Sequence, residues 1–347
     1  MPGASGSDNS NSDKVEAIMK SLKLMGCVAA VLAGVGVATP ASASLTTFQQ
    51  YVGNYAVSTD GWGSGSQAGT ISAEVPVGAT VVAAYLYTAT YHFSDFPVNA
   101  PGGTFNGNAV AYVSRGTNET TFPGFGLTAY RADVTSIVQP LVDGGPGGVY
   151  DFRVTETIGD QDGSALVVVY ELASLPVGTV GILDGFSASQ GDSAAINYAT
   201  ALDPTAPGFF AEMRLGINFS AGESQYSEVY VNGTLITAKA GDYDDGEGGN
   251  GALITVGGFD DPFSPLLPPN KAGDHERYDL APYIGVGDTS IAIRTLNPSN
   301  DDNIFLAVFH TSGEGRVVTE TPEPGSLALL GLGLMGLGLS RRRKFRH

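Results

Sequence analysis

Three short acidic runs hold the residues whose types are best suited to binding chemistry. They read DQDGS at residues 160–164, DYDDGE at 242–247 and NDDN at 300–303. Each run concentrates carboxylate or amide oxygens on a turn that contains Gly or Asn, and Ca²⁺ prefers such ligands and tolerates irregular geometry. None of the runs has the EF-hand spacing, so a calcium site and a solvated acidic turn both remain open. The candidate ligands are Asp160, Asp162, Asp242, Asp244, Asp301 and Asp302.

The residues that catalysis would need do not occur at a recognisable spacing. Neither an HExxH nor a GxSxG motif is present. We expect the internal histidines, His92, His275 and His310, to be solvated or locally hydrogen-bonded rather than metal ligands. A glycoside hydrolase needs only two carboxylates, but nothing in the sequence separates a catalytic pair from a solvated one. The sequence therefore predicts no enzyme and no catalytic residue, with a secreted carbohydrate-active hydrolase as the alternative.

Aromatic side chains in or near Gly/Pro-rich segments are candidates for stacking on sugar rings. They are Trp62, Tyr91, Phe93, Phe96 and Phe125. Core packing is the usual role of aromatic residues in strands, and we expect it for most of these. For Trp62, which is set in the glycine-rich run GWGSG, a binding role and a core role are equally open.

The segments that must position these residues have the character of strands. Their content of β-branched and aromatic residues is high, and Gly, Pro, Asn or Asp bounds most of them. The clearest are residues 81–91, 165–170, 290–295 and 304–310. Asn106-Gly107 and Asn232-Gly233 predict tight hairpins, because both central positions of a type I′ turn need positive φ. We therefore expect an all-β fold of antiparallel, jelly-roll-like sandwiches.

The body of the chain shows one order of features twice. The order occurs between residues 105 and 170 and again between residues 231 and 309. It consists of an Asn-Gly turn, a short segment with Arg and Asp, a strand, an acidic run and an apolar strand. A join near residues 175–178 would separate the two copies. The sequence thus predicts two tandem antiparallel β-sandwich domains, at residues 44–175 and 176–317.

The charge balance restricts the partners. The chain has 35 Asp and Glu against 17 Lys and Arg, a formal charge of −18, and the cations gather near its two ends. We expect no nucleic-acid partner, because phosphates demand a basic surface. An acidic body is typical of an exported protein that stays soluble by self-repulsion or binds cations. The single cysteine, Cys27, lies in a segment that we expect to be removed, so the mature protein would have no disulfide.

An export signal is predicted near the N-terminus. Residues 1–18 are polar and are expected to form a disordered extension, with Met19 as the favoured true start. Residues 19–43 combine a charged end, an apolar stretch at 28–37 and the A-x-A cleavage site Ala41-Ser42-Ala43. We expect signal peptidase to remove this segment.

The C-terminal tail has three parts in a fixed order. Pro322-Glu323-Pro324 leads into a Gly/Leu-rich run at residues 327–339, which a basic block closes. The block contains Arg341, Arg342, Arg343 and Lys344. The apolar run favours a bilayer and the cations stop it on the cytoplasmic side, although it is shorter than the ~20 apolar residues of a comfortable helical span. The tail therefore predicts a short transmembrane helix that serves as a transient anchor, with an ordinary tail anchor as the alternative.

This tail, residues 321–346, resembles the PEP-CTERM sorting signal of Gram-negative bacteria. The resemblance implies that an exosortase, a membrane-embedded cysteine transpeptidase, cuts the chain near Pro322, Glu323 and Pro324. It further implies transient anchoring in the inner membrane, followed by transfer to the cell surface or extracellular matrix. We expect a non-catalytic structural or adhesive protein there, which binds polysaccharide or neighbouring proteins with calcium ordering its acidic loops.

Overall fold

The computed structural model describes most of the chain between residues 44 and 319. The described ranges are 44–63, 65–93, 101–119, 125–157, 161–188, 190–218, 226–241, 254–299 and 303–319. Residues 43–322 form one compact unit, and residues 1–42 and 323–347 lie outside the described ranges. Within those ranges, no helix has the length and apolar character needed to cross a membrane.

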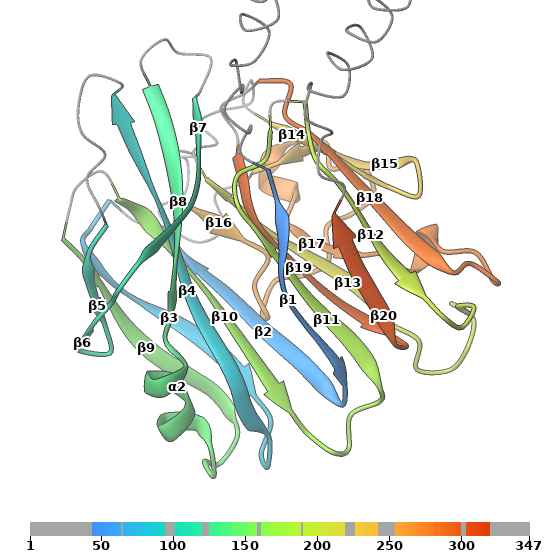
Figure 1. Cartoon of the computed structure of the whole chain (residues 1–347), viewed down its shortest axis with the longest axis horizontal. Helices are drawn as coiled ribbons and strands as arrows, with labels where there is room; N and C mark the ends of the chain where they lie inside the picture. Colours follow the sequence, from blue (N-terminus) through green and yellow to red (C-terminus); the bar gives the residue numbers. More distant parts are fainter. Residues whose placement is uncertain are drawn as a thin grey trace, which may run out of the picture. The chain divides into compact units, whose positions relative to one another are not determined.

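The first half of the body builds two antiparallel sheets (Figure 1). Inner sheet 1 has the strand order β2-β10-β4-β8-β7. Its strands are β2 (Tyr55–Trp62), β4 (Thr80–Phe93), β7 (Val113–Glu119), β8 (Phe125–Asp133) and β10 (Gln161–Glu171). Outer sheet 1 has the order β3-β9-β5-β6. Its strands are β3 (Ala68–Val75), β5 (Gly103–Phe105), β6 (Asn108–Ala109) and β9 (Gly148–Glu156), and the helix α2 (Thr135–Val142) follows β8.

The second half builds another inner and another outer sheet. Inner sheet 2 has the order β1-β11-β19-β13-β16, with β17 also paired to β13. Its strands are β1 (Thr46–Gly53), β11 (Gly178–Asp184), β13 (Ala211–Asn218), β16 (Thr255–Val256), β17 (Arg277–Asp279) and β19 (Asn303–Ser312). Outer sheet 2 has the order β15-β14-β18-β12-β20. Its strands are β12 (Ser193–Tyr198), β14 (Ser227–Val231), β15 (Thr234–Ala240), β18 (Ser290–Leu296) and β20 (Gly315–Thr319), and short 3₁₀ turns lie at η1 (Lys271–Gly273) and η2 (Ala281–Tyr283).

Three hydrophobic cores join the four sheets into successive layers, which follow one another from left to right in Figure 1. The first core lies between outer sheet 1 and inner sheet 1 and includes Phe152 and Val168. The middle core lies between the two inner sheets and includes Tyr87 and Phe305, whose rings are 6.4 Å apart. The third core lies between inner sheet 2 and outer sheet 2 and includes Phe309. The expectation of an all-β antiparallel fold is confirmed.

The burial of the inner sheets on both faces explains why their central strands are continuously apolar. Every residue of β11 is buried, and β10 is buried without interruption from Gly163 to Tyr170. A strand in this position gains from an apolar residue on either face, so the alternation typical of half-exposed strands disappears. By contrast, β18 in outer sheet 2 alternates strictly between buried and accessible residues.

The repeat predicted from the sequence is visible in the sheet order. The order β2-β10-β4-β8 of inner sheet 1 corresponds to β11-β19-β13-β17 of inner sheet 2, and β3-β9-β5-β6 corresponds to β12-β18-β14-β15. Both predicted Asn-Gly turns form hairpins, β5–β6 and β14–β15, with φ of 50° at Asn106 and 48° at Asn232. The two pairs of sheets therefore share one order of strand connections.

The expected boundary near residue 175 falls in the connection between β10 and β11. The two halves share the middle core, and β1, which precedes all the strands of the first half, pairs with β11 of the second. A buried charge pair also spans the inner sheets, since the guanidinium of Arg131 on β8 bonds the carboxylate of Asp184 on β11. The division into separate domains at residues 44–175 and 176–317 stays a prediction.

Candidate functional site

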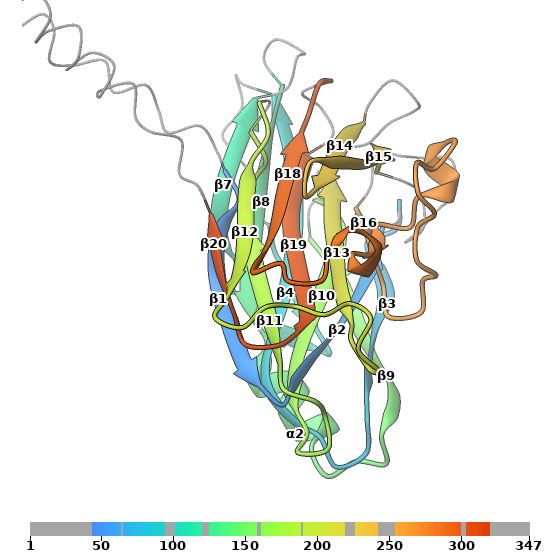
Figure 2. The same ribbon diagram turned by 90° about the vertical axis from the view of Figure 1, so that its right-hand side faces the viewer.

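A groove lies on the accessible face of outer sheet 2, which Figure 2 turns toward the viewer. The alternation along β12 and β18 decides which residues form it. Ile196 and Ile291 point into the third core, so their neighbours Ala195 and Ala292 point outward. Ala195 and Ala292 are direct cross-strand partners, and their small side chains leave the centre of the face hollow.

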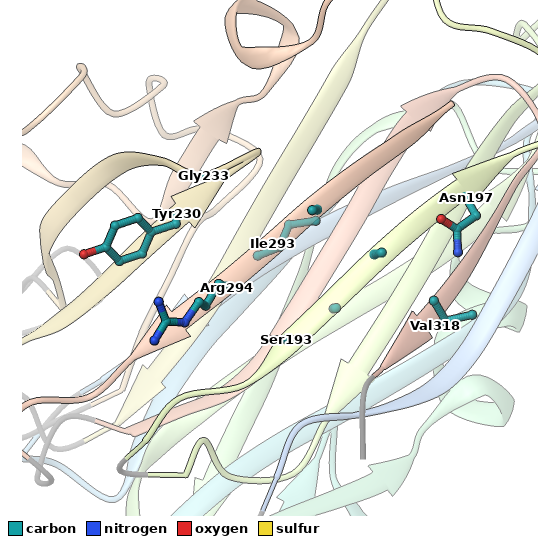
Figure 3. Close-up of a pocket in the computed structure, with 10 residues that line it drawn as sticks. Ser193, Asn197, Tyr230, Gly233, Ile293, Arg294 and Val318 are labelled. Atoms are coloured by element: carbon teal, nitrogen blue, oxygen red, sulfur yellow. The ribbon is translucent and has the colours of Figure 1, made fainter. Parts of the chain in front are cut away.

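The groove encloses about 550 Å³ and has different chemistry at its two ends (Figure 3). Tyr230 and Arg294 lie at one end, and Asn197 and Val318 lie at the other. The full lining is Ser193, Ala194, Ala195, Asn197, Tyr230, Gly233, Ala292, Ile293, Arg294 and Val318. The result is a shallow apolar floor with polar groups at its edges.

The polar groups at the Tyr230 end are held by neighbours on adjacent strands. Tyr230 and Arg294 are register partners on β14 and β18, and the guanidinium carbon lies 5.9 Å from the centre of the ring. The Tyr230 hydroxyl donates to Glu228 Oε2 at 2.7 Å, and this hydrogen bond raises the pKa of Tyr230 above its ordinary value. The ring is therefore a neutral, oriented surface beside a cation.

Such an arrangement can bind a sugar, and the carboxylate next to it, that of Glu228, accepts the hydrogen bond of the Tyr230 hydroxyl. An aromatic ring offers a platform for the apolar face of a pyranose, while arginine and asparagine supply hydrogen bonds. Among the described residues that line the groove there is no carboxylate, histidine or cysteine. The charged side chain of the described lining is Arg294, which offers an anionic ligand a partner, while the nearby carboxylate of Glu228 is engaged by the Tyr230 hydroxyl.

A separate group of carboxyls lies near the end of β2. Burial raises the pKa of Asp60 to about 7, against the lowering effect of the backbone N–H of Ser72, and the nearby charges of Asp260 and Asp261 add smaller increases. The N–H of Ser72 donates to Asp60 Oδ2 at 2.5 Å. A carboxyl that is protonated near neutral pH is what a general acid requires, so this group is a candidate acid for hydrolysis.

The predicted calcium ligands fall where the structure gives no side-chain description. Asp160, Asp242, Asp244, Asp301 and Asp302 lie outside the described residues, and Asp162 belongs to β10 without a described side chain. Within the described ranges, no three His, Cys, Asp or Glu side chains are grouped to hold a metal. Two of the acidic runs lie at the starts of equivalent strands, because β10 begins at Gln161 and β19 at Asn303.

One buried amide beside these strands has polar atoms without partners. Asn218 is fully buried at the end of β13, opposite Asn303, and neither its Oδ1 nor its Nδ2 has a hydrogen-bond partner within the part of the chain that the structure describes. A buried amide left in this state is costly, so an unassigned partner is expected there. Its oxygen is of the type that calcium accepts.

Two of the aromatic candidates from the sequence, Trp62 and Tyr91, pack against hydrophobic cores. Trp62 is half-buried against the first core. Its indole packs so closely on Gly69 that a Cβ placed on that glycine would lie only 2.0 Å from Trp62 Nε1. Tyr91 packs against the middle core. Phe96 lies outside the described residues, and the side chains of Phe93 and Phe125 are not described. The sequence missed Tyr230, for which the adjacent Asn232-Gly233 turn and the alternation of β14 were the available signals.

The predicted processing residues at both ends of the chain lie outside the described ranges. They are Ala41, Ala43, Pro322, Glu323, Pro324, Arg341, Arg342, Arg343 and Lys344. The histidines have varied surroundings: the ring of His310 is 4.5 Å from that of Phe210, and burial lowers the pKa of His310 to about 4.

Comparison with known proteins identifies the C-terminal tail. Neither the curated proteins nor the solved structures contain a match to the chain. A family model described as the PEP-CTERM protein-sorting motif matches residues 320–344. That motif implies an exported protein which is sorted through an exosortase and anchored transiently at the membrane. The match covers the three-part tail identified from the sequence, and the chain therefore carries a PEP-CTERM sorting motif at this end.

Proposed function

We propose that the exported body is a non-catalytic structural or adhesive component of the cell surface or extracellular matrix, which binds acidic polysaccharide through the groove on outer sheet 2. The observation that carries the proposal is the pairing of Tyr230 with Arg294 over a floor of small residues. A carboxylated sugar would place its apolar face on the ring and its carboxylate on the guanidinium. The sorting motif supports a role outside the cytoplasm.

The chemistry of the lining supports the proposal of binding without turnover. Hydrolysis of a glycosidic bond requires an acid and a second carboxylate on the two sides of the bond. The described lining supplies neither, while its hydrogen-bonding groups suit recognition. The shallow, open form of the face also fits a chain that continues past the site in both directions.

The maturation of the protein is part of the same proposal. We infer that signal peptidase cuts after Ala43 and that exosortase cuts near residues 322–324, which leaves the β body as the mature protein. Calcium would bind the acidic runs at residues 160–162, 242–244 and 301–302 and thereby order the loops beside the strand starts. The unpartnered Oδ1 of Asn218 supports a polar ligand at that end of β13.

The test is a binding assay with a polyuronate and a neutral glucan of similar length. The exported protein should bind the polyuronate in preference. Arg294→Gln should weaken binding by about 10-fold or more, since a hydrogen bond to a charged group contributes about 1.5–3 kcal/mol. Tyr230→Ala should also weaken it, whereas Arg153→Gln, an exposed change on β9 of outer sheet 1, should leave it unchanged. Equal affinity of the wild type and the Arg294 variant would refute the assignment of the groove.

A second candidate function is the hydrolase, which the raised pKa of Asp60 favours. Its sign would be release of reducing ends from a polysaccharide by the purified protein. Asp60→Asn should then abolish turnover while Arg294→Gln leaves the rate per bound chain intact. Turnover that survives Asp60→Asn would exclude this carboxyl as the acid.

A further inference from the structure

Asp192, whose carboxylate is half-buried, lies directly before β12 and next to Leu45, at the start of the described residues. Asp192 accepts hydrogen bonds from two backbone groups, the N–H of Leu45 on Oδ1 at 3.2 Å and the N–H of Ala188 on Oδ2 at 3.2 Å. Its own N–H donates to Thr295 Oγ1 at 3.0 Å. The carboxylate is thus fixed in position and turned toward the start of the chain's folded part.

The surroundings of this carboxylate are apolar. Asp192 borders a narrow cavity between inner sheet 2 and outer sheet 2, and it is the only charged residue among the described residues of the lining. The other residues of the described lining are apolar or carry an uncharged hydroxyl, as Thr295 and Thr319 do. Burial raises the pKa of Asp192 to about 6, although the hydroxyl of Ser44 and the two backbone N–H groups oppose the rise. A cation at this position would relieve the cost of the buried charge.

The chain itself brings a nitrogen atom to this place. The carbonyl oxygen of Ser44 lies 2.2 Å from the position that a Cβ on Gly185 would take, and Gly185 has φ of +145°. The backbone of Ser44 is therefore seated against a residue that has to be glycine. The Ser44 nitrogen is one residue, at most about 3.6 Å, away from the Leu45 nitrogen, whose N–H donates to Asp192.

We propose that Asp192 is a binding site for a primary ammonium group, and that its ligand is the chain's own α-ammonium on Ser44 after cleavage behind Ala43. In the uncut chain the Ser44 nitrogen is a neutral amide. Cleavage of the Ala43–Ser44 peptide bond by water gives a carboxylate on the leaving segment and an ammonium on Ser44. The new charge then pairs with Asp192, so removal of the leader stabilises the start of β1 and β12.

The ion pair has a defined pH range. No described cation would repel the ammonium, because the described residues that face Asp192 from β11, β13, β18, β19 and β20 are uncharged. Pairing should raise the pKa of the α-amino group above its ordinary range of about 7.7–8.0. The pair contributes to stability while Asp192 is ionised and the amine is protonated. The contribution is lost as the pH rises through the raised pKa of the amine, and also as the pH falls through the pKa of Asp192.

The site also concerns the other end of the body. Thr319, the last residue of β20, lines the same cavity and pairs with Ala194 on β12. The sorting motif begins at residue 320. The paired N-terminus would therefore brace the strand from which the sorting tail departs.

The test measures the reactivity of the α-amino group in the exported protein purified from its own cells. Intact mass first establishes the start, and a start other than Ser44 would overturn the proposal. At neutral pH an amine whose pKa is raised by one unit reacts about 10-fold more slowly with an acylating reagent. We expect at least that protection in the native protein relative to the same protein denatured in urea. Asp192→Asn should abolish it, and Asp203→Asn, an exposed change in the same half, should not.

Two further outcomes keep the test decisive. If Asp192→Asn does not fold, the pH dependence of acylation in the wild type alone gives the α-amino pKa, and an unshifted value would overturn the proposal. The inference rests on the cleavage assumed above but not on the glycan site. A protein that starts at Ser44 with a protected amine and fails to bind polyuronate would refute only the proposed function.

Discussion

Replacing Phe309 by alanine should reveal whether the two halves of the body unfold together. Phe309 is fully buried in the third core, on a strand whose other face, with Val308 and Phe305, forms the middle core. Removing a buried phenylalanine ring costs about 3–5 kcal/mol, through lost transfer free energy and the cavity left behind. With a denaturant dependence of about 4 kcal/mol per molar guanidinium, the midpoint should fall by about 1 M.

The chain provides a reporter on the opposite side of the molecule. Its single tryptophan, Trp62, packs against the first core, and the middle core separates that core from the third core, which holds Phe309. Trp62 fluorescence therefore follows the first half, while far-UV circular dichroism follows all four sheets. Because the halves share the middle core, we expect the two signals to shift together in Phe309→Ala.

The corresponding variant in the first half is Phe152→Ala, which removes a ring stacked on that of Phe105 in the first core, with 5.2 Å between the ring centres. It should shift both signals by a similar amount. The reasoning would be refuted if Phe309→Ala moved the circular dichroism transition and left the Trp62 transition at the wild-type midpoint. That result would mean that residues 44–175 and 176–317 are independent domains.

Three other predictions concern single features. Burial raises the pKa of Glu156 from 4.5 to about 8, so the folded state keeps a proton that the unfolded state loses. The free energy of unfolding should therefore fall between about pH 5 and pH 8, by roughly 1 kcal/mol per pH unit. In urea titrations, Glu156→Gln should flatten that slope. Gln50 on β1 donates to Gly315 O at 2.8 Å and accepts from Val317 N–H at 2.7 Å on β20, so Gln50→Ala should destabilise by about 1–3 kcal/mol and speed hydrogen exchange at Val317; unchanged exchange would contradict this. Calcium at 100 times its Kd should stabilise the protein by about 2.7 kcal/mol, and a melting temperature that EGTA does not change would remove calcium from the account.

The features that could be predicted from the sequence were local or repeated. The Asn-Gly pairs specified both hairpins because few other residues accept positive φ at both central positions. The apolar runs at residues 165–170 and 304–309 identified β10 and β19 because strands buried on both faces need no polar alternation. The order of these features disclosed the repeat, since each copy uses the same turns between the same strands.

The features that could not be predicted depend on pairing between distant strands. β1 joins inner sheet 2 by pairing with β11, although its sequence is equally suited to an edge of the first sandwich. The groove depends on Ala195 lying opposite Ala292, and no local pattern specifies which two alanines meet. Asp192 resembles any other acidic turn residue until Leu45 and Ala188 are brought onto its two oxygens.

Intact mass spectrometry of the native protein, fractionated into membrane, surface and medium, tests most directly the claim that the protein is an exported and sorted β body. We predict a species that starts at Ser44, ends near residues 322–324 and is recovered outside the membrane fraction. A species that retains residues 325–347 and stays in the membrane would contradict the account, because the tail would then be a permanent anchor.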